Sequence, residues 1–511
     1  MFNNNLRVLA VLLKRKFSIK QNVIKRNKLI AFLLLVLLMP ITWSCHDFLE
    51  QKPQDGLVRA DYWNNKEEVL ATLAGAYKQF AVLDYNLLLY GELRGDMLDR
   101  GFGLQSDIDN IMTGNIYSGN DYAKWEDFYS VINLCNHIIS IAPSVQEKDL
   151  TFSDFLLQQY ISEATFLRSL TYFYLVRIWN NVPLVLEPTE TDNADFYLPL
   201  SDASEVLNKI KDDLINIRLT TPNVYPTMEQ SKSRATSGAV NALLADICLW
   251  NFEYEEALQY ATNVEESGNY FIVPAIEWFD IFRYGSSLET IFEIYFDQQI
   301  DERNGLYNNT FIQNYFFASE YASTILGIEV LGASEQVRGN GSISISQKIW
   351  KYAGNSPDKR TPRPTSEQYS ANFIIYRLSD VLLMKAEALS QLERYDEALY
   401  YINLIRERAN VNPLNITGNK NDFENAILEE RAKELAFEGK RWFDLLRMGR
   451  RDNYANKQKL INILVRNVPS TQRLVQEAKL SNPLGWFMPI HRDEIERNNN
   501  ISQNTYYYEA E

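Results

Sequence analysis

Two segments of this chain repeat one helix–turn–helix pattern, and this repeat limits the possible folds more than any other feature. The segments span residues 242–264 and 382–405. The positions that match at one constant offset are Ala245 with Ala386, Tyr254 with Tyr395, and Glu256-Ala257-Leu258 with Glu397-Ala398-Leu399. Small residues where two helices touch, and an aromatic residue that opens the second helix, are what tetratricopeptide hairpins need. The repeat predicts stacked helical pairs, which are binding scaffolds more often than catalytic ones; two unrelated amphipathic hairpins are the alternative.

Apolar residues recur at helical spacing along most of the chain. The stretches with this spacing are residues 66–83, 125–141, 155–179, 203–217, 237–266, 374–409 and 423–448. The first stretch has Asn64 and Asn65 as candidate N-caps. The segments between the helical stretches are rich in Gly, Asn, Ser and Pro, mainly at residues 99–122, 268–348 and 354–372. Residues 289–297 have a β-like pattern. We therefore predict a mostly α, tetratricopeptide-like frame with large irregular insertions and minor β structure.

The N-terminus has the order of a secretory signal. Basic residues precede an apolar run at 29–38, and Cys45 follows a Met-Pro break and small residues. The run is shorter than the ~20 residues that span a bilayer. We predict a signal peptide with an N-terminal extension at residues 1–44, a lipidated Cys45 in a tether at 45–60, and one domain at 61–511. The alternative is that Cys45 is a spare thiol behind an ordinary signal.

Charge and metal-binding residue types exclude several functions. The chain has 51 basic and 66 acidic residues, and eight of the basic residues lie in the predicted signal, so the remainder carries 43 basic against 66 acidic. A body this acidic repels phosphate backbones, which argues against nucleic-acid binding. Only three His and three Cys occur, without a close His pair. We therefore expect no metal site and no cofactor, and we expect Cys135 and Cys248 to be buried thiols.

Eight segments resemble, in order, the SusD/RagB family of nutrient-binding outer-membrane lipoproteins. They are GELRGDMLD (91–99), WEDFYSVINLCNHII (125–139), EATFLRSLTYFYLVRIWNNVPLV (163–185), RATSGAVNALLADICLW (234–250), IIYRLSDVLLMKAEAL (374–389), INLIRERA (402–409), ILEERAKELAFEGKRWFDLLR (427–447) and FMPIHRDEIERNNNISQN (487–504). Together with Cys45 they span nearly the whole mature chain. One such segment alone would be weak support for the resemblance, but the eight segments in this order are specific to the family.

The resemblance implies a fold, a location and partners. Family members have a helical body of four tetratricopeptide-like units with an irregular ligand-binding face. They are lipid-anchored in the outer membrane and cover a SusC-like TonB-dependent transporter. Their ligands are usually oligosaccharides and sometimes glycopeptides or peptides. The resemblance therefore implies a membrane-anchored nutrient-binding protein that is not an enzyme.

Charged residues within apolar helices predict salt bridges that define the fold, because a buried charge must be paired. Glu163, Arg168 and Arg177 are in this position. Farther along the chain, Arg431 with Glu434 and Glu438 with Arg441 are spaced for ion pairs along one helix. The RGD at residues 94–96 has the sequence of an adhesion motif, but within GELRGDMLD we interpret it as structural.

The insertions are the expected place for ligand contacts, because the scaffold is what family members share. The candidate residues are Arg100, Phe102, Asp107 and Tyr117 in an insertion near 99–122, and Trp278, Tyr284, Tyr295, Tyr307 and Tyr315 in an insertion near 268–372. Sugar C–H faces stack on aromatic rings, while Asn, Asp and Arg bind hydroxyls. The alternative for each ring is that it packs the loop onto the helices.

Two other classes of function stay open from the residues themselves. A surface glycan-processing enzyme would need a carboxylate pair such as Asp107 and Asp109, whose separation in space decides the matter. A protein-interaction scaffold would use the tetratricopeptide-like surface. Retention of a ligand without hydrolysis would separate binding from catalysis. Acidic loops also leave calcium-assisted binding open.

Overall fold

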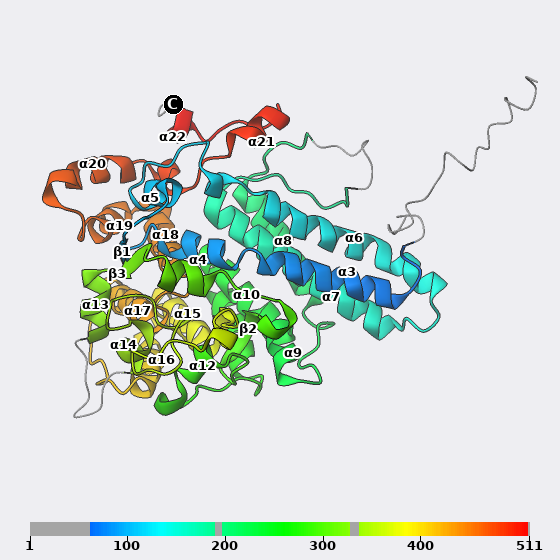
Figure 1. The fold of residues 1–511 in the computed structure, drawn as a ribbon, viewed down its shortest axis with the longest axis horizontal. Coiled ribbons are helices and arrows are strands. Elements are labelled where there is room, and N and C mark those ends of the chain that lie inside the picture. Colours follow the sequence, from blue (N-terminus) through cyan, green and yellow to red (C-terminus); the bar gives the residue numbers. More distant parts are fainter. Residues whose placement is uncertain (1–61, 190–196, 328–336, 509–511) are drawn as a thin grey trace, which may run out of the picture. The chain divides into compact units, whose positions relative to one another are not determined.

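The N-terminal helices of the protein form one layer. The computed structural model describes residues 62–189, 197–327 and 337–508, so the predicted signal, tether and Cys45 lie outside the described residues. Helices α3 (Lys66–Ala81), α6 (Glu126–Lys148) and α7 (Asp154–Trp179) run side by side, and α8 (Ala203–Ile217) packs on α7 (Figure 1). The Asn65 side chain caps α3 by accepting a hydrogen bond from the Glu68 N–H at 3.0 Å.

The predicted repeat forms two helical hairpins that pack on each other. The first consists of α10 (Ser237–Trp250) and α11 (Tyr254–Glu265), and the second of α15 (Leu378–Gln391) and α16 (Tyr395–Arg408). Helix α11 packs against α15, which stacks one hairpin on the other. Ala245 and Ala386 are both fully buried, so the small residues allow the close helix contacts that the sequence predicted.

Two short antiparallel sheets join segments that are far apart in the chain. Strand β1 (Leu98–Arg100) pairs with β3 (Phe316–Ala318), and β2 (Thr290–Ile294) pairs with β4 (Phe373–Arg377). Strand β2 confirms the β-like pattern at residues 289–297. The helix predicted from residue 374 is wrong at its start, because β4 precedes α15. All five residues of β4 are buried, and a short run without alternation of apolar and polar residues does not distinguish a buried strand from a helix.

Several further helices were not predicted or differ from the prediction. The stretch at 423–448 divides into α17 (Lys420–Glu434) and α18 (Arg441–Tyr454). Helix α4 (Asp84–Glu92) was missed, and α5 (Ser106–Met112) interrupts the insertion that was predicted to be irregular. The remaining helices of four or more residues in the described ranges are α9 (Met228–Ser233), α12 (Asp280–Arg283), α13 (Glu320–Gly327), α14 (Val337–Ser342), α19 (Lys457–Leu464), α20 (Ser470–Leu480), α21 (Arg492–Arg497) and α22 (Thr505–Tyr508), besides the short elements η6 (Asn308–Ile312) and η8 (Pro483–Trp486).

Two glycines allow α4 to contact the turn between α17 and α18. A Cβ atom on Gly91 would lie 1.9 Å from the Gly439 carbonyl oxygen, so a side chain does not fit there. Gly439 has a φ of +72°, a conformation that favours glycine. Next to this contact, Glu92 Oε1 accepts hydrogen bonds from the Gly439 N–H at 2.9 Å and the Lys440 N–H at 3.3 Å.

The charged motifs pair between elements, and the pairs predicted along one helix are wrong. Arg431 binds Asp444 at 2.8 Å instead of Glu434, and Arg441 binds Asp96 at 2.7 Å instead of Glu438. The break at residues 435–440 explains the second error, because it separates Glu438 from the helix that carries Arg441.

The other acidic residues of this motif belong to a buried ion-pair network. Glu434 pairs with Arg377 and Arg408, and Glu438 pairs with Arg377 and Lys351. The predicted salt bridges near the N-terminus are confirmed as pairs of Glu163 with Arg234, Arg168 with Asp213, and Arg177 with Asp246.

Candidate ligand-binding surface

The pairing of β1 with β3 joins the two insertions that the sequence singled out. Arg100 lies opposite Phe316 in the register, and Leu98 lies opposite Ala318. The Gly101 N–H extends the ladder by donating to the Tyr315 carbonyl at 2.8 Å. A Cβ on Gly101 would lie 1.9 Å from the Asn314 carbonyl oxygen. The first insertion is therefore held against the second by main-chain contacts.

Exposed side chains gather where these strands meet. Phe102 is 80% exposed, and its ring centroid lies 6.2 Å from that of Phe317 in an edge-to-face arrangement. Arg100 Nε lies 2.6 Å from Asp109 Oδ1, which ties the end of β1 to α5. We name this region the β1–β3 surface and define it by Arg100, Phe102, Asp107, Asp109, Tyr117 and Phe317. Phe317 was missed by the sequence analysis, and the Phe316-Phe317 pair was its only signal.

Helix α5 positions Tyr117 at the edge of this surface. The Tyr117 hydroxyl donates to Asp107 Oδ1 at 2.8 Å, and the Asp121 N–H donates to Asp107 Oδ2 at 2.9 Å. The hydrogen bond to Asp107 raises the pKa of Tyr117, so the hydroxyl stays neutral and available for hydrogen bonding. The Asp107 carboxylate thus positions Tyr117 through a hydrogen bond, and the Asp109 carboxylate positions Arg100 through an ion pair.

A group of tyrosines lies beside the β1–β3 surface. Burial raises the pKa of Tyr85, and the neighbouring Tyr122 and Tyr315 raise it further. Burial, followed by Asp107 and Tyr315, raises the pKa of Tyr122 to about 12. These phenols are neutral near pH 7. Tyr315, one of the predicted contacts, is half-buried in this group.

Trp278 and Tyr307 belong to the protein interior, and their prediction as ligand contacts is wrong. Trp278 is fully buried against Phe282, with ring centroids 5.1 Å apart, and its Nε1 donates to Glu434 at 3.3 Å. Tyr307 is buried against Phe311 and Tyr369. The second insertion is long enough to form a small hydrophobic core of its own, and these rings fill it.

Tyr284 and Tyr295 are separate from the β1–β3 surface. Tyr284 is 72% exposed and directly follows α12, which lies apart from β1 in Figure 1. Tyr295 follows β2 and lines a cavity between β2 and α3. The predicted contact residues therefore divide into four on the β1–β3 surface, the half-buried Tyr315 beside it, the isolated Tyr284, Tyr295 in a cavity wall, and two core residues.

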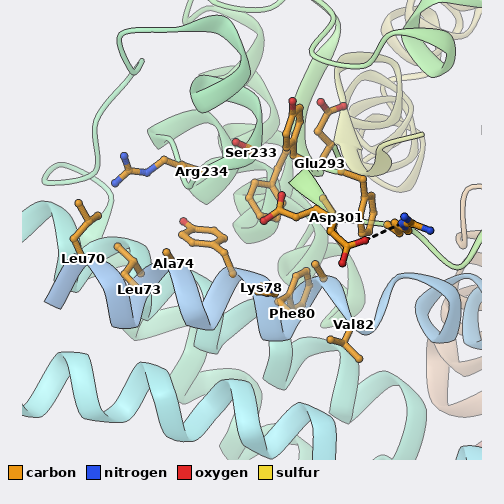
Figure 2. Close-up of a pocket in the computed structure, with 18 residues that line it drawn as sticks. Leu70, Leu73, Ala74, Lys78, Phe80, Val82, Ser233, Arg234, Glu293 and Asp301 are labelled. Carbon is orange, nitrogen blue, oxygen red and sulfur yellow. Dashed lines mark ion pairs between the residues drawn. The ribbon is translucent and has the colours of Figure 1, made fainter. Parts of the chain in front are cut away.

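The cavity that Tyr295 lines has a volume of about 420 Å³ and mainly apolar walls (Figure 2). Leu70 and Leu73 of α3, with Val82 directly after the helix, form one side, and β2 with residues 301–303 forms the other. This cavity was not predicted from the sequence. Its signal was that Leu70 and Val82 are apolar positions outside the buried stripe of α3, and both are exposed.

Most of the charged groups at this cavity have partners within the protein. Arg234 Nη2 lies 2.6 Å from Glu163 Oε1, and Arg303 pairs with Asp301 at 3.0 Å. Glu293 is fully buried, and its Oε1 accepts from Asn372 Nδ2 at 2.6 Å. Burial raises the pKa of Glu293, while its hydrogen bonds and Lys232 lower it less. The cavity is thus a mainly apolar space in which most of the charged groups are compensated.

Among the described residues, one group has the geometry of a metal site. It consists of Cys248, Glu253 and Glu256, whose ligand atoms lie within 4.8 Å of one another. Lys211 Nζ lies 2.6 Å from the Glu253 carboxylate and 2.7 Å from that of Glu256. Burial raises the pKa of the Cys248 thiol, which disfavours the thiolate that a metal requires. The Lys211 ammonium therefore neutralises the two carboxylates, and no metal ion is needed to do so.

Comparison with known proteins decides the family. The model described as "SusD family" matches residues 250–508, and the model described as "Starch-binding associating with outer membrane" matches residues 47–249. The chain belongs to the SusD family. SusD-like protein P38 of Formosa agariphila is 26% identical over 474 residues, which cover 83% of this chain and 91% of that protein.

Solved structures of the SusD family share the fold. A SusD superfamily protein from Bacteroides vulgatus has a TM-score of 0.73 at 19% identity and covers 87% of this chain and 100% of its own. Surface glycan-binding protein A from Bacteroides uniformis has a TM-score of 0.70 at 19% identity, over 86% of this chain and 100% of its own. The mostly helical architecture predicted from the sequence is thus the SusD fold.

Proposed function

We propose that this SusD-family chain is an outer-membrane surface lipoprotein that binds glycans and delivers them to a SusC-like TonB-dependent transporter. The observation that carries the proposal is the exposed β1–β3 surface on a SusD scaffold. The matched family description names starch binding and the outer membrane, and a protein of the same fold is named as glycan-binding. These names support the ligand class and the location.

The chemistry of the β1–β3 surface suits a sugar. Phe102 and Phe317 offer apolar ring surface for the C–H face of a pyranose. Arg100 and the Tyr117 hydroxyl stand at the edge of that surface and can bind hydroxyl groups. The surface is open, so it can hold part of a long chain while the rest continues into a transporter.

Membrane attachment in this proposal depends on Cys45. A triacylated cysteine inserts several acyl chains, and each buried methylene contributes ~0.8 kcal/mol, so the anchoring is stable. Residues 45–60 then serve as the tether that precedes the helical body. The transporter partner follows from the family resemblance and is tested by co-purification from outer membranes.

Isothermal titration with a panel of neutral oligosaccharides tests the ligand class. Maltoheptaose, cellohexaose, xylohexaose, mannohexaose and laminarihexaose are titrated into the folded protein. We expect at least one to bind, and Phe102→Ala with Phe317→Ala to weaken that binding by about tenfold or more, because each lost stacking contact contributes about 1 kcal/mol. Tyr284→Ala, which removes an exposed ring elsewhere, should leave the affinity unchanged.

Two results would refute the proposal. The first is that no oligosaccharide of the panel binds. The second is that the oligosaccharide that binds is hydrolysed by the protein alone, which chromatography of the recovered sugar would detect.

A further inference from the structure

A polar crevice of about 710 Å³ lies where α13, α17, α18 and α19 meet. Its lining differs from that of the apolar cavity beside α3, because side-chain amides dominate it. The five carboxamides are Asn421, Asn425, Asn456, Gln458 and Asn462. None of the residues that define the β1–β3 surface lines this crevice.

Every charged side chain in the lining has a partner of opposite charge. The pairs are Lys459 with Glu424 at 3.1 Å, Glu429 with Lys433 at 2.7 Å, Arg441 with Asp96 at 2.7 Å, and Arg466 with Asp96 at 3.5 Å. An ionic ligand would have to compete with these pairs. The lining therefore favours an uncharged ligand.

The carboxamides keep free hydrogen-bonding groups. Asn425 makes no side-chain hydrogen bond with the described residues, and Asn462 only accepts one, from Gln458 Nε2 at 2.9 Å. Asn421 also only accepts, from Lys459 Nζ at 2.9 Å. Asn456 only donates, to the Met448 carbonyl at 3.2 Å. Free NH₂ groups and free carbonyl oxygens thus line the same space.

This combination matches a polyhydroxylated molecule. A hydroxyl group both donates and accepts, and a carboxamide offers both functions within one planar group. Tyr321 adds aromatic surface to the lining, and the Arg466 guanidinium lies 4.1 Å from its ring centroid, which holds the ring in place. Amides from two helices and one aromatic ring therefore surround a space large enough for a sugar unit.

We infer that this crevice is a second ligand site, which binds a neutral sugar segment through its carboxamides. The inference rests on the proposed function for its ligand class, but it uses none of the residues of the β1–β3 surface. A glycan chain or a second molecule can occupy the crevice while the β1–β3 surface is filled.

The test uses the full folded protein that already carries Phe102→Ala and Phe317→Ala. Residual binding of the oligosaccharide panel named above is measured by titration, with and without Asn425→Ala and Asn462→Ala. Both asparagines are exposed, so these changes leave the fold intact. Gln472→Ala with Asn499→Ala is the matched control, because both amides are exposed and neither lines the crevice.

We expect the crevice changes to weaken the residual binding by about tenfold, as two lost hydrogen bonds predict, and the control to have no effect. Crystals soaked with the tightest neutral oligosaccharide should show it in the crevice. The inference is overturned if the residual affinity is insensitive to the crevice changes, if the soaked crevice is empty, or if oligogalacturonate binds there more tightly than neutral sugars.

The outcomes also separate this inference from the proposed function. If the unmodified protein binds oligosaccharides and only the crevice variants have no effect, the second site is wrong and the proposed function stands. If no glycan binds the unmodified protein, both are wrong.

Discussion

Asp96 and Arg441 form a bidentate ion pair, with Nε donating to Oδ1 at 2.7 Å and Nη2 donating to Oδ2 at 3.0 Å. Both side chains are buried, and 345 residues separate them in the chain. Asp96 is the acidic residue of the RGD sequence, so this pair excludes it from an exposed adhesion motif. The Arg94 side chain of the same sequence is half-buried, and its guanidinium donates to the Gly485 carbonyl at 2.6 Å.

Removal of Asp96 should destabilise the protein strongly. Asp96→Ala leaves the buried Arg441 without its counter-ion, and breaking a buried pair in this way typically costs about 3–5 kcal/mol. Urea unfolding followed by circular dichroism measures the effect. Glu397→Gln breaks the exposed pair with Arg394 and should leave the unfolding midpoint unchanged. Equal midpoints for the two variants would contradict the structural role of Asp96.

The space around two helical glycines, Gly91 and Gly75, predicts opposite effects of their substitution by alanine. Gly91→Ala places a methyl group in the Gly439 backbone, so we expect loss of several kcal/mol of stability or of soluble protein. Gly75 lies within α3 and has open space around its Cβ position. Gly75→Ala should therefore stabilise the fold by about 0.5–1 kcal/mol. Thermal unfolding of both variants checks the prediction, and a tolerated Gly91→Ala would refute the close approach.

Trp278 should matter for stability and not for ligand binding. Trp278→Ala removes a fully buried ring from the small core of the second insertion and should cost about 3–5 kcal/mol. The affinity for oligosaccharides, measured below the unfolding transition, should not change. A loss of affinity in a variant that is fully folded would place Trp278 back among the ligand contacts.

Glu92 should make stability decrease as the pH rises. Burial raises the pKa of Glu92 from its ordinary value of 4.5 to about 8, although the Lys440 and Gly439 N–H groups, Arg441 and Lys351 oppose the shift. Between these pH values the folded protein holds a proton that the unfolded chain has released. The contribution of this group to the free energy of unfolding is therefore full below pH 4.5 and is lost as the pH rises to 8.

Glu92→Gln tests this dependence, because an amide cannot ionise. We expect the variant to exceed the unmodified protein in stability at pH 9, by on the order of a few kcal/mol, and to resemble it at pH 5. Urea unfolding at both pH values provides the measurement. Parallel stability curves for the two proteins would show that Glu92 does not titrate in this range.

Cys45 should determine membrane retention. Cys45→Ser removes the thiol that carries the lipid in the proposal, so the protein should leave the membrane fraction and lose its acyl mass from the N-terminal peptide. Cys135→Ala changes a buried thiol in α6 and should leave the protein membrane-bound. Membrane retention of the Cys45→Ser variant would exclude this anchor.

The sequence predicted what depends on local periodicity. Helix α8 has the predicted bounds, and the N-cap of α3 is one of the two residues proposed. The pattern did not show the break at Gly439, because the apolar spacing continues on both sides of it. It also could not distinguish the buried strand β4 from the helix that follows.

The candidate site was only partly predictable for a similar reason. Arg100, Phe102, Asp107 and Tyr117 are brought together on the β1–β3 surface. Trp278 and Tyr307 are in the interior, because an aromatic residue in a long insertion can fill a local core as well as face solvent. Phe317 joined the site through strand pairing across more than two hundred residues, and no local pattern indicates such a pairing.

The ladder between Leu98–Arg100 and Phe316–Ala318 consists of main-chain hydrogen bonds. Such bonds do not depend on which side chains the two segments carry. Mutations can therefore replace the outward-facing residues of either insertion while the pairing of β1 with β3 is retained. Under the proposed function, ligand specificity can therefore change at these two strands through exchange of aromatic and polar side chains, without changes in the helices beneath.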